Sequence, residues 1–239
     1  MTAEPYRTWV ERWEKTIEAV RRVGGRADEL SIGPPATEAE IVATERAIGR
    51  RLPPSFRQVL LEFSGSVSVY WTLPGPGGVA ESIGRSLEEQ LLGRPIDPLR
   101  HVPTGEVSLR LGMVQFAERG RRERSATLRR WRRRRRTSSI SDESLARWDR
   151  SVAFWWQDDS AVALDTDDAA AVVLLDRYGS DADSSTWLAP DFMEFMDRWT
   201  RIGGVQAHYL DQFIQEPWGG LDPECDLARV WRDALHVHL

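Results

Sequence analysis

The sequence is short of several residues that enzymes and secreted proteins depend on. Among its 239 residues is one cysteine, Cys225, so no intramolecular disulfide can form, and this usage fits a reducing compartment. Of its 32 basic residues only Lys15 is a lysine. A phosphate-binding P-loop, a Schiff-base lysine and lysine-dependent nuclease motifs are therefore excluded.

Motifs for other kinds of catalysis are also missing. The four histidines and the cysteine do not have the spacing of a zinc site, and no Gly-x-Ser-x-Gly elbow is present to hold a nucleophile. We therefore expect no catalytic residue, no metal site and no cofactor, and the sequence favours a binding protein over an enzyme.

Long apolar runs are absent as well. No stretch approaches the roughly 18 apolar residues that cross a bilayer, and the first fifteen residues lack the basic and then apolar pattern of a signal peptide. With 41% hydrophobic residues and 11 tryptophans, the composition predicts a folded protein with most tryptophans in its core. We expect a cytoplasmic protein that does not associate with membranes.

The charge is unevenly distributed along the chain. The net charge is −5, but residues 119–136 hold eleven arginines and one acid, Glu123, so that this segment carries +10 and the rest carries −15. The acidic remainder of the chain, which we call the acidic body, attracts basic partners and repels nucleic acid. The arginine tract alone would attract nucleic acid and repel basic partners.

Residues 35–65 give the clearest local signals. Thr37 and Glu40 have the spacing of a capping box at a helix start. A second helix is expected after the paired prolines 53 and 54, because proline is tolerated in a first helical turn, and Gly65 ends it. Alternating apolar residues at 67–73 then predict a strand, and 107–116 is a weaker strand candidate.

The order of these signals resembles the SUKH superfamily of fungal cell-wall-synthesis regulators and bacterial toxin-immunity proteins. The matching positions are Pro35-Ala36-Thr37, Glu40-Ile41, Ile48-Gly49 in place of the usual Leu-Gly, Leu52-Pro53, Phe56, Leu60-Leu61 and Ser64-Gly65. The resemblance continues from 150 to 200, where strands near 152–156, 161–164 and 171–175 precede a helix bearing Phe192 and Trp199.

Together these patterns predict an α+β fold, with helices packed on a mostly antiparallel sheet. We expect a single SUKH-like domain that carries an N-terminal helix (5–24), an Arg-rich insertion (117–138) and a C-terminal helical tail (203–239). A short helix is expected after Ser139, and another is possible at 86–92.

The resemblance implies a protein-binding role, such as an immunity protein that neutralises a cognate toxin by occlusion. The acidic body agrees with a basic, nucleic-acid-targeting toxin domain as partner. Our predicted contact residues are the acids between the strands and one neighbouring tryptophan: Asp158, Asp159, Asp165, Asp167, Asp168 and Trp156. Asp165-Thr166-Asp167 also resembles a metal-binding Asp-x-Asp, but it lacks the glycine and glutamate of a calcium loop, so turn chemistry is the favoured interpretation.

The arginine tract leaves a second interpretation open. As a helix it would have a cationic surface interrupted only by Leu128 and Trp131, and such clusters can bind phosphates and stack bases. The candidate polyanion-binding residues are Arg129, Arg130, Arg132, Arg133, Arg134, Arg135 and Arg136. For the tract itself, the alternatives to nucleic-acid binding are a solvated insertion loop or a tract that folds against the acidic body. For the whole protein, the alternatives are a nucleic-acid-associated regulator that uses this tract, or a signalling or scaffold adaptor like the fungal proteins of the superfamily.

Overall fold

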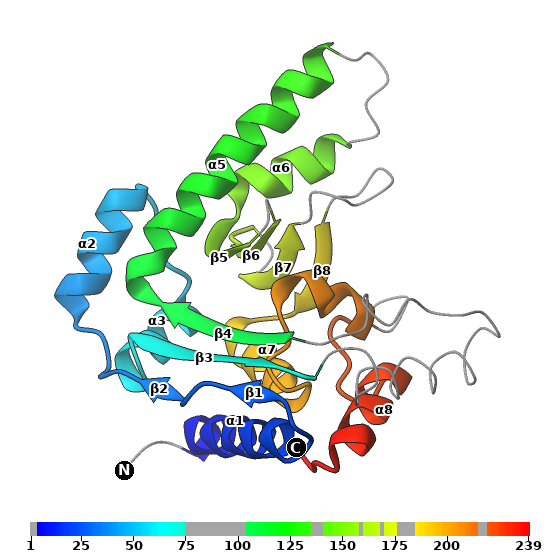
Figure 1. Ribbon diagram of the computed structural model, residues 1–239. Helices are drawn as coiled ribbons and strands as arrows, with labels where there is room; N and C mark the ends of the chain where they lie inside the picture. Colours follow the sequence, from blue (N-terminus) through cyan, green and yellow to red (C-terminus); the bar gives the residue numbers. More distant parts are fainter. Residues whose placement is uncertain are drawn as a thin grey trace. The chain divides into compact units, whose positions relative to one another are not determined.

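The computed structural model describes residues 4–74, 104–134, 141–157, 160–167, 170–175, 185–214 and 219–239 (Figure 1). These residues form helices and two antiparallel sheets, which confirms the predicted α+β class. The chain divides into two compact units, the first comprising Met1–Ile32, Val67–Ser108 and Met196–Leu239, the second Gly33–Ser66 and Leu109–Phe195. Within the described part, no helix is both long enough and apolar enough to span a membrane.

The first unit combines helices with a sheet centred on β3. Its elements are α1 (Glu4–Arg22), β1 (Arg26–Ala27), β2 (Ser31–Ile32), most of β3 (Ser66–Thr72) and of β4 (Thr104–Arg110), the later part of α7 (Phe192–Arg201), η3 (Ala207–Phe213) and α8 (Asp226–Leu235). Strand β3 pairs antiparallel with β1 and β2, and β4 also pairs with β3. The predicted helix at 5–24 and the predicted strand at 67–73 are confirmed.

Trp71 organises the core of the first unit. Its indole nitrogen donates a hydrogen bond of 2.9 Å to the carbonyl oxygen of Gly203, and its ring lies 5.7 Å from that of Trp231. Opposite Trp71, a Cβ at Gly105 would stand 2.0 Å from the indole, so only glycine fits there. As the composition predicted, most of the described tryptophans are buried.

The second unit holds the segments that carry the SUKH resemblance. Its elements are α2 (Glu38–Ile48), α3 (Pro54–Glu62), α5 (Leu111–Arg134), α6 (Asp142–Arg150), β5 (Val152–Gln157), β6 (Ser160–Asp165), β7 (Ala171–Leu175), β8 (Ser185–Ala189) and the start of α7. The four strands form an antiparallel meander in the order β5-β6-β7-β8. Sequence patterns predicted the first three strands correctly and missed β8.

A cluster of phenylalanines joins α3, β5 and α7 inside this unit. The ring of Phe56 lies 4.7 Å from that of Phe192 and 5.5 Å from that of Phe154, and the latter two rings meet edge to face at 5.2 Å. All three side chains are buried. Aromatic pairs of this kind add stability beyond the area that they bury, so the cluster fixes α3 and α7 against the meander.

The helix termini follow the predicted chemistry in part. Thr37 and Glu40 form the capping box of α2, and Gly49 ends that helix in the left-handed conformation. Helix α6 is capped by Ser141, whereas Ser139, the predicted start, lies outside the described residues, as do the possible helix at 86–92 and most of the glycine-rich turn at 74–78.

The strand prediction at 107–116 is wrong in its second half. For the described part of the arginine tract, the interpretation as a solvated loop is also wrong, whereas a tract that folds against the protein agrees with the structure. Strand β4 ends at Arg110 and α5 begins at Leu111. This 24-residue helix has a buried face at helical spacing, made of Val114, Ala117, Glu118, Arg121, Arg124, Ser125 and Leu128. The sequence showed no apolar stripe because half of that face is polar.

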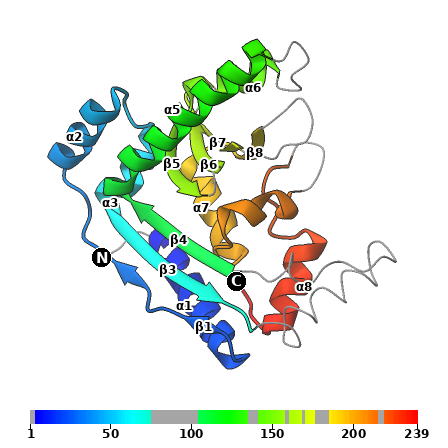
Figure 2. The same ribbon diagram turned by 45° about the horizontal axis from the view of Figure 1, so that its top comes forward.

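Helix α5 packs against β5 and lies beside α2 and α6 (Figures 1 and 2). Close packing on the sheet depends on Gly120, where a Cβ would stand 2.6 Å from the indole ring of Trp156. Gly112, in the first turn of the same helix, has open space around it. A side chain is therefore excluded at Gly120 and tolerated at Gly112, although both glycines lie in α5.

We expect Gly120→Ala to destabilise the protein by about 1–3 kcal/mol, because the added methyl must displace the Trp156 ring. Gly112→Ala should instead stabilise it by up to about 1 kcal/mol through helix propensity. Urea unfolding of both variants measures the difference. Equal stability of the two would contradict the packing of α5 on β5.

Candidate functional site

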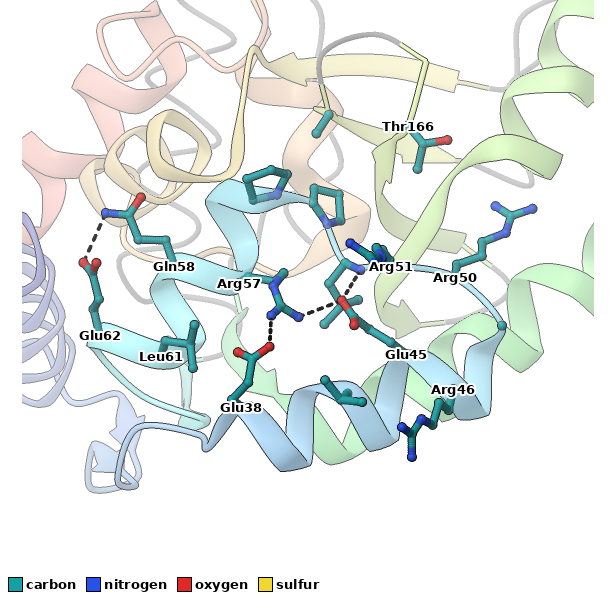
Figure 3. A pocket seen from close by; sticks show the side chains of 16 residues that line it. Glu38, Glu45, Arg46, Arg50, Arg51, Arg57, Gln58, Leu61, Glu62 and Thr166 are labelled. Carbon is teal, nitrogen blue, oxygen red and sulfur yellow. Dashed lines mark hydrogen bonds and ion pairs between the residues drawn. The ribbon is translucent and has the colours of Figure 1, made fainter.

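A groove of about 1300 Å³ lies between α2 and α3 of the second unit (Figure 3). Residues from the segment that joins the two helices, and from the chain after β6, complete its lining. The lining residues are Glu38, Val42, Glu45, Arg46, Gly49, Arg50, Arg51, Leu52, Pro53, Pro54, Arg57, Gln58, Leu61, Glu62, Thr166 and Ala170. Sequence reasoning did not find this groove, although it lies in the stretch with the clearest helix signals.

The two helical walls of the groove are tied together by Arg57 of α3. Its guanidinium donates to the Glu45 carboxylate at 2.8 Å and also contacts the Glu38 carboxylate, both on α2 (Figure 3). The same Glu45 oxygen accepts the backbone N–H of Leu52 at 2.8 Å. Two of the acids in the groove therefore have an internal partner, and they hold its shape.

Arg50 closes the end of the groove nearest to α6. Its guanidinium donates to the carbonyl oxygens of Asp149, Arg150 and Ser151 at 2.6, 2.8 and 3.0 Å. These carbonyls end α6 and have no partner within the helix. Burial lowers the pKa of Arg50, as does the nearby positive charge of Arg121. Arg50 is thus a structural cap for the end of α6.

The chain after β6 places one of the predicted acids inside the protein. Asp165 ends β6, and its side chain is 2% exposed. Arg150 donates to both carboxylate oxygens, at 2.7 and 2.8 Å, and Arg147 lies 3.3 Å away. Burial would raise the pKa of Asp165, but the hydrogen bonds from Arg150 and the backbone N–H of Asp167 lower it overall. Asp165 therefore anchors β6 to α6 and presents no free oxygen to a metal or a partner.

The other predicted contact residues have different positions. The side chain of Asp167 is 73% exposed, next to Thr166 on the rim of the groove. Trp156 is half-buried and packs over Gly120. Asp158, Asp159 and Asp168 lie outside the described residues. The structure thus brings one exposed predicted acid, Asp167, beside the groove.

A buried carboxylate at Glu118 connects α5 to the sheet. Arg121 donates to both of its oxygens at 2.7 and 2.8 Å, Arg122 adds a bond of 2.9 Å, and the backbone N–H of Ala153 on β5 adds one of 3.2 Å. Burial would raise the pKa of Glu118, but its hydrogen bonds with Arg121 and the positive charge of Arg121 lower it overall. The i, i+3 and i, i+4 spacing of these residues could have revealed the pairs from the sequence.

The guanidinium groups around Glu118 reach further elements. Arg121 also donates to the carbonyl of Trp148 on α6, and Arg122 donates to the carbonyl of Ile48 at the end of α2. One buried acid thus holds two arginines that connect α5 to both neighbouring helices. Both arginines serve the fold, although only Arg121 is buried, since the side chain of Arg122 is 49% exposed.

The last turns of α5 differ from this buried part. Arg129 forms an ion pair with Asp149, and Arg132 forms one with Asp142. Arg130 and Arg133 are exposed, Arg134 is the last residue of the helix, and Arg135 and Arg136 lie outside the described residues. Trp131 is 48% exposed, with the Arg124 guanidinium 5.0 Å from its ring centroid.

In the described ranges, no three His, Cys, Asp or Glu side chains come together as ligands of a metal would. The isolated cysteine, Cys225, caps α8 and accepts from the backbone N–H of Ala228 at 3.4 Å. What the described part of the second unit offers is an open groove with a mixed-charge lining and a basic helix end.

Comparison with known proteins adds one finding. A family model described as SMI1 / KNR4 family (SUKH-1) matches residues 35–198, which include the groove, the meander and all of α5. No curated protein and no solved structure was found to match the chain.

Glu118→Gln should destabilise the protein by about 3–5 kcal/mol, because it leaves the buried guanidinium of Arg121 without its counter-ion. Glu123→Gln, on the exposed face of the same helix, removes the same charge and should change stability by less than about 0.5 kcal/mol. Denaturant unfolding of both variants tests the network. An equal loss of stability in both variants would contradict the prediction, because it would show that the loss comes from removing any negative charge from α5 and not from the Glu118 network.

Lowering the pH should destabilise the folded protein, because it protonates the buried carboxylates of Glu118 and Asp165. The folded-state pKa values of Glu118 and Asp165 are lowered, so their stabilisation is complete above the unfolded-state pKa of about 4 and is lost as the pH falls through the folded-state values. We therefore expect the free energy of unfolding to drop below about pH 4. The drop should be shallower in Asp165→Asn than in the unmodified chain, which unfolding curves between pH 2 and 7 would measure; parallel curves would contradict it.

Proposed function

Because this chain belongs to the SMI1 / KNR4 family (SUKH-1), we propose that it is a non-enzymatic protein-binding module, an immunity protein that neutralises a cognate toxin. The observation that carries the proposal is the match over residues 35–198, which spans most of the chain. In this proposal the protein acts in the cytoplasm and covers the active site of the toxin.

The distribution of charge supports a basic partner. Outside residues 119–136 the chain carries −15, and this excess would steer a cationic toxin domain, such as one that acts on nucleic acid, towards the protein. Part of this excess is neutralised within the protein, since Arg121 and Arg122 share the Glu118 carboxylate and Arg129 and Arg132 pair with two acids of α6, and these three acids are among those counted in the −15. The acids available to a basic partner are among the remaining ones.

The groove between α2 and α3 supports a docking surface. Its lining includes apolar side chains such as Val42 and Leu61, and Asp167 stands exposed beside its rim. Apolar contacts surrounded by polar groups are the usual composition of a protein interface. We place the partner across this groove and the acidic chain segment after β6.

Co-purification from the native cell, followed by co-expression with the toxin-like partner that it recovers, tests the proposal, and recovery of no such partner would contradict it. The toxin alone should arrest growth, and the chain should restore it by forming a stable complex. Asp167→Arg together with Leu61→Arg should weaken that complex by about tenfold or more, because the first repels a basic partner and the second obstructs the groove.

Asp233→Arg is the matched control for the Asp167→Arg change, since it makes the same acid-to-arginine substitution at an exposed position of α8 and should leave affinity and protection intact. Circular dichroism and urea midpoints establish that the groove variant is folded. The absence of any protection by the unmodified chain would contradict the immunity role. Binding to another protein without protection would favour the adaptor.

A further inference from the structure

The arginines of α5 separate into two groups with different environments. Up to Ser125 the helix uses its buried face for packing, and Arg121 is 2% exposed. Beyond Leu128 the described side chains are exposed or half-exposed, and four guanidinium groups, those of Arg129, Arg130, Arg132 and Arg133, stand near two carboxylates, Asp142 and Asp149. This end of the helix therefore keeps a local excess of positive charge.

The excess is carried by Arg130 and Arg133. Neither has an ion pair within the described ranges, and their i, i+3 spacing places them side by side on the helix surface. The acids elsewhere in the chain are largely screened at physiological salt, where the Debye length is about 8 Å. An anion that approaches the end of α5 therefore meets a cationic surface although the protein as a whole is acidic.

An exposed aromatic ring lies in the same turn of the helix as Arg130 and Arg133. Trp131 is 48% exposed, which is unusual for so large a side chain, and the guanidinium of the buried Arg124 holds its ring at 5.0 Å. Between the same turns of α5 and the start of α6, a hollow of about 420 Å³ is lined by Arg129, Arg132, Arg133, Asp142, Leu145 and Ala146. Both an exposed ring and a hollow lined by three arginines and two apolar side chains suit a nucleotide, whose base stacks on an aromatic ring and whose phosphate binds guanidinium groups.

We propose that the last turns of α5 form a binding site for single-stranded nucleic acid. Arg130 and Arg133 contact backbone phosphates, and Trp131 stacks on a base. A single strand fits better than a duplex because the bases of a duplex are stacked on one another and cannot offer their faces to Trp131. The proposal is independent of toxin neutralisation, which uses the groove between α2 and α3.

Fluorescence anisotropy of a labelled twenty-nucleotide oligo-dT, titrated with the full chain at several salt concentrations, tests this site. The unmodified chain should bind, with an affinity that falls as salt rises. Arg130→Gln with Arg133→Gln should lower the affinity about tenfold or more and reduce the slope of log K against log salt by about 1.4, since each phosphate contact on a single strand contributes about 0.7.

Trp131→Ala should lower the affinity roughly 5- to 100-fold with the salt slope unchanged, because stacking releases no counterion. Arg110→Gln with Arg119→Gln is the matched control, since it removes two exposed charges at and near the opposite end of α5 and should bind like the unmodified chain. Oligo-rU should bind comparably to oligo-dT.

Several outcomes would overturn the proposal. One is equal loss of affinity in the two double variants, because net charge alone would then explain the binding. Another is equally tight binding of a poly-glutamate peptide, which would show a general preference for anions and no role for the bases. Absence of binding by the unmodified chain would also overturn it, and would leave the immunity proposal untouched.

Discussion

The second unit depends on a carboxylate that water does not reach. Glu118 neutralises the guanidinium groups of Arg121 and Arg122 and accepts a backbone N–H of β5, and through those two arginines it is connected to the ends of α6 and α2. Burying a charge costs several kcal/mol unless a partner compensates it. Glu118 can therefore be buried only together with its arginine partners. The face of α5 that carries these residues is for this reason the one that packs against β5.

Guanidinium groups also bind backbone carbonyls at the ends of α6 and α7. Arg50 donates to three carbonyls at the end of α6, and in the first unit Arg232 donates to the carbonyl of Arg201 at the end of α7. A guanidinium is a planar fork that can serve two or more acceptors at once, which the point charge of a lysine cannot reproduce. In a chain with a single lysine, the arginines thus act as helix caps as well as surface charges.

Sequence patterns predicted those parts of the fold whose signals are local. The capping box of Thr37 and Glu40 needs only its own helix, and the strands of the meander are short apolar runs between turn residues. The α+β class and the family followed from the order of these signals. That the chain forms a single domain remains a prediction.

What sequence patterns missed depends on contacts between distant segments. The buried face of α5 contains Arg121 and Glu118, which count as surface residues unless their mutual pairing is recognised. The groove exists because Arg57 ties α3 to α2, and Asp165 is buried because Arg150, fifteen residues earlier, reaches it. A pattern of aspartates alone does not reveal which of them, like Asp167, stays in solvent.

Helix α6 has one further consequence. Its last carbonyls are held by Arg50 at the groove, while Asp142 at its first turn is paired with Arg132 of α5. The helix is nine residues long, so these two attachments are about 14 Å apart. One short helix therefore borders both places: its end carbonyls accept from Arg50 of the groove, and its first turns supply Asp142, Leu145 and Ala146 to the hollow beside the end of α5.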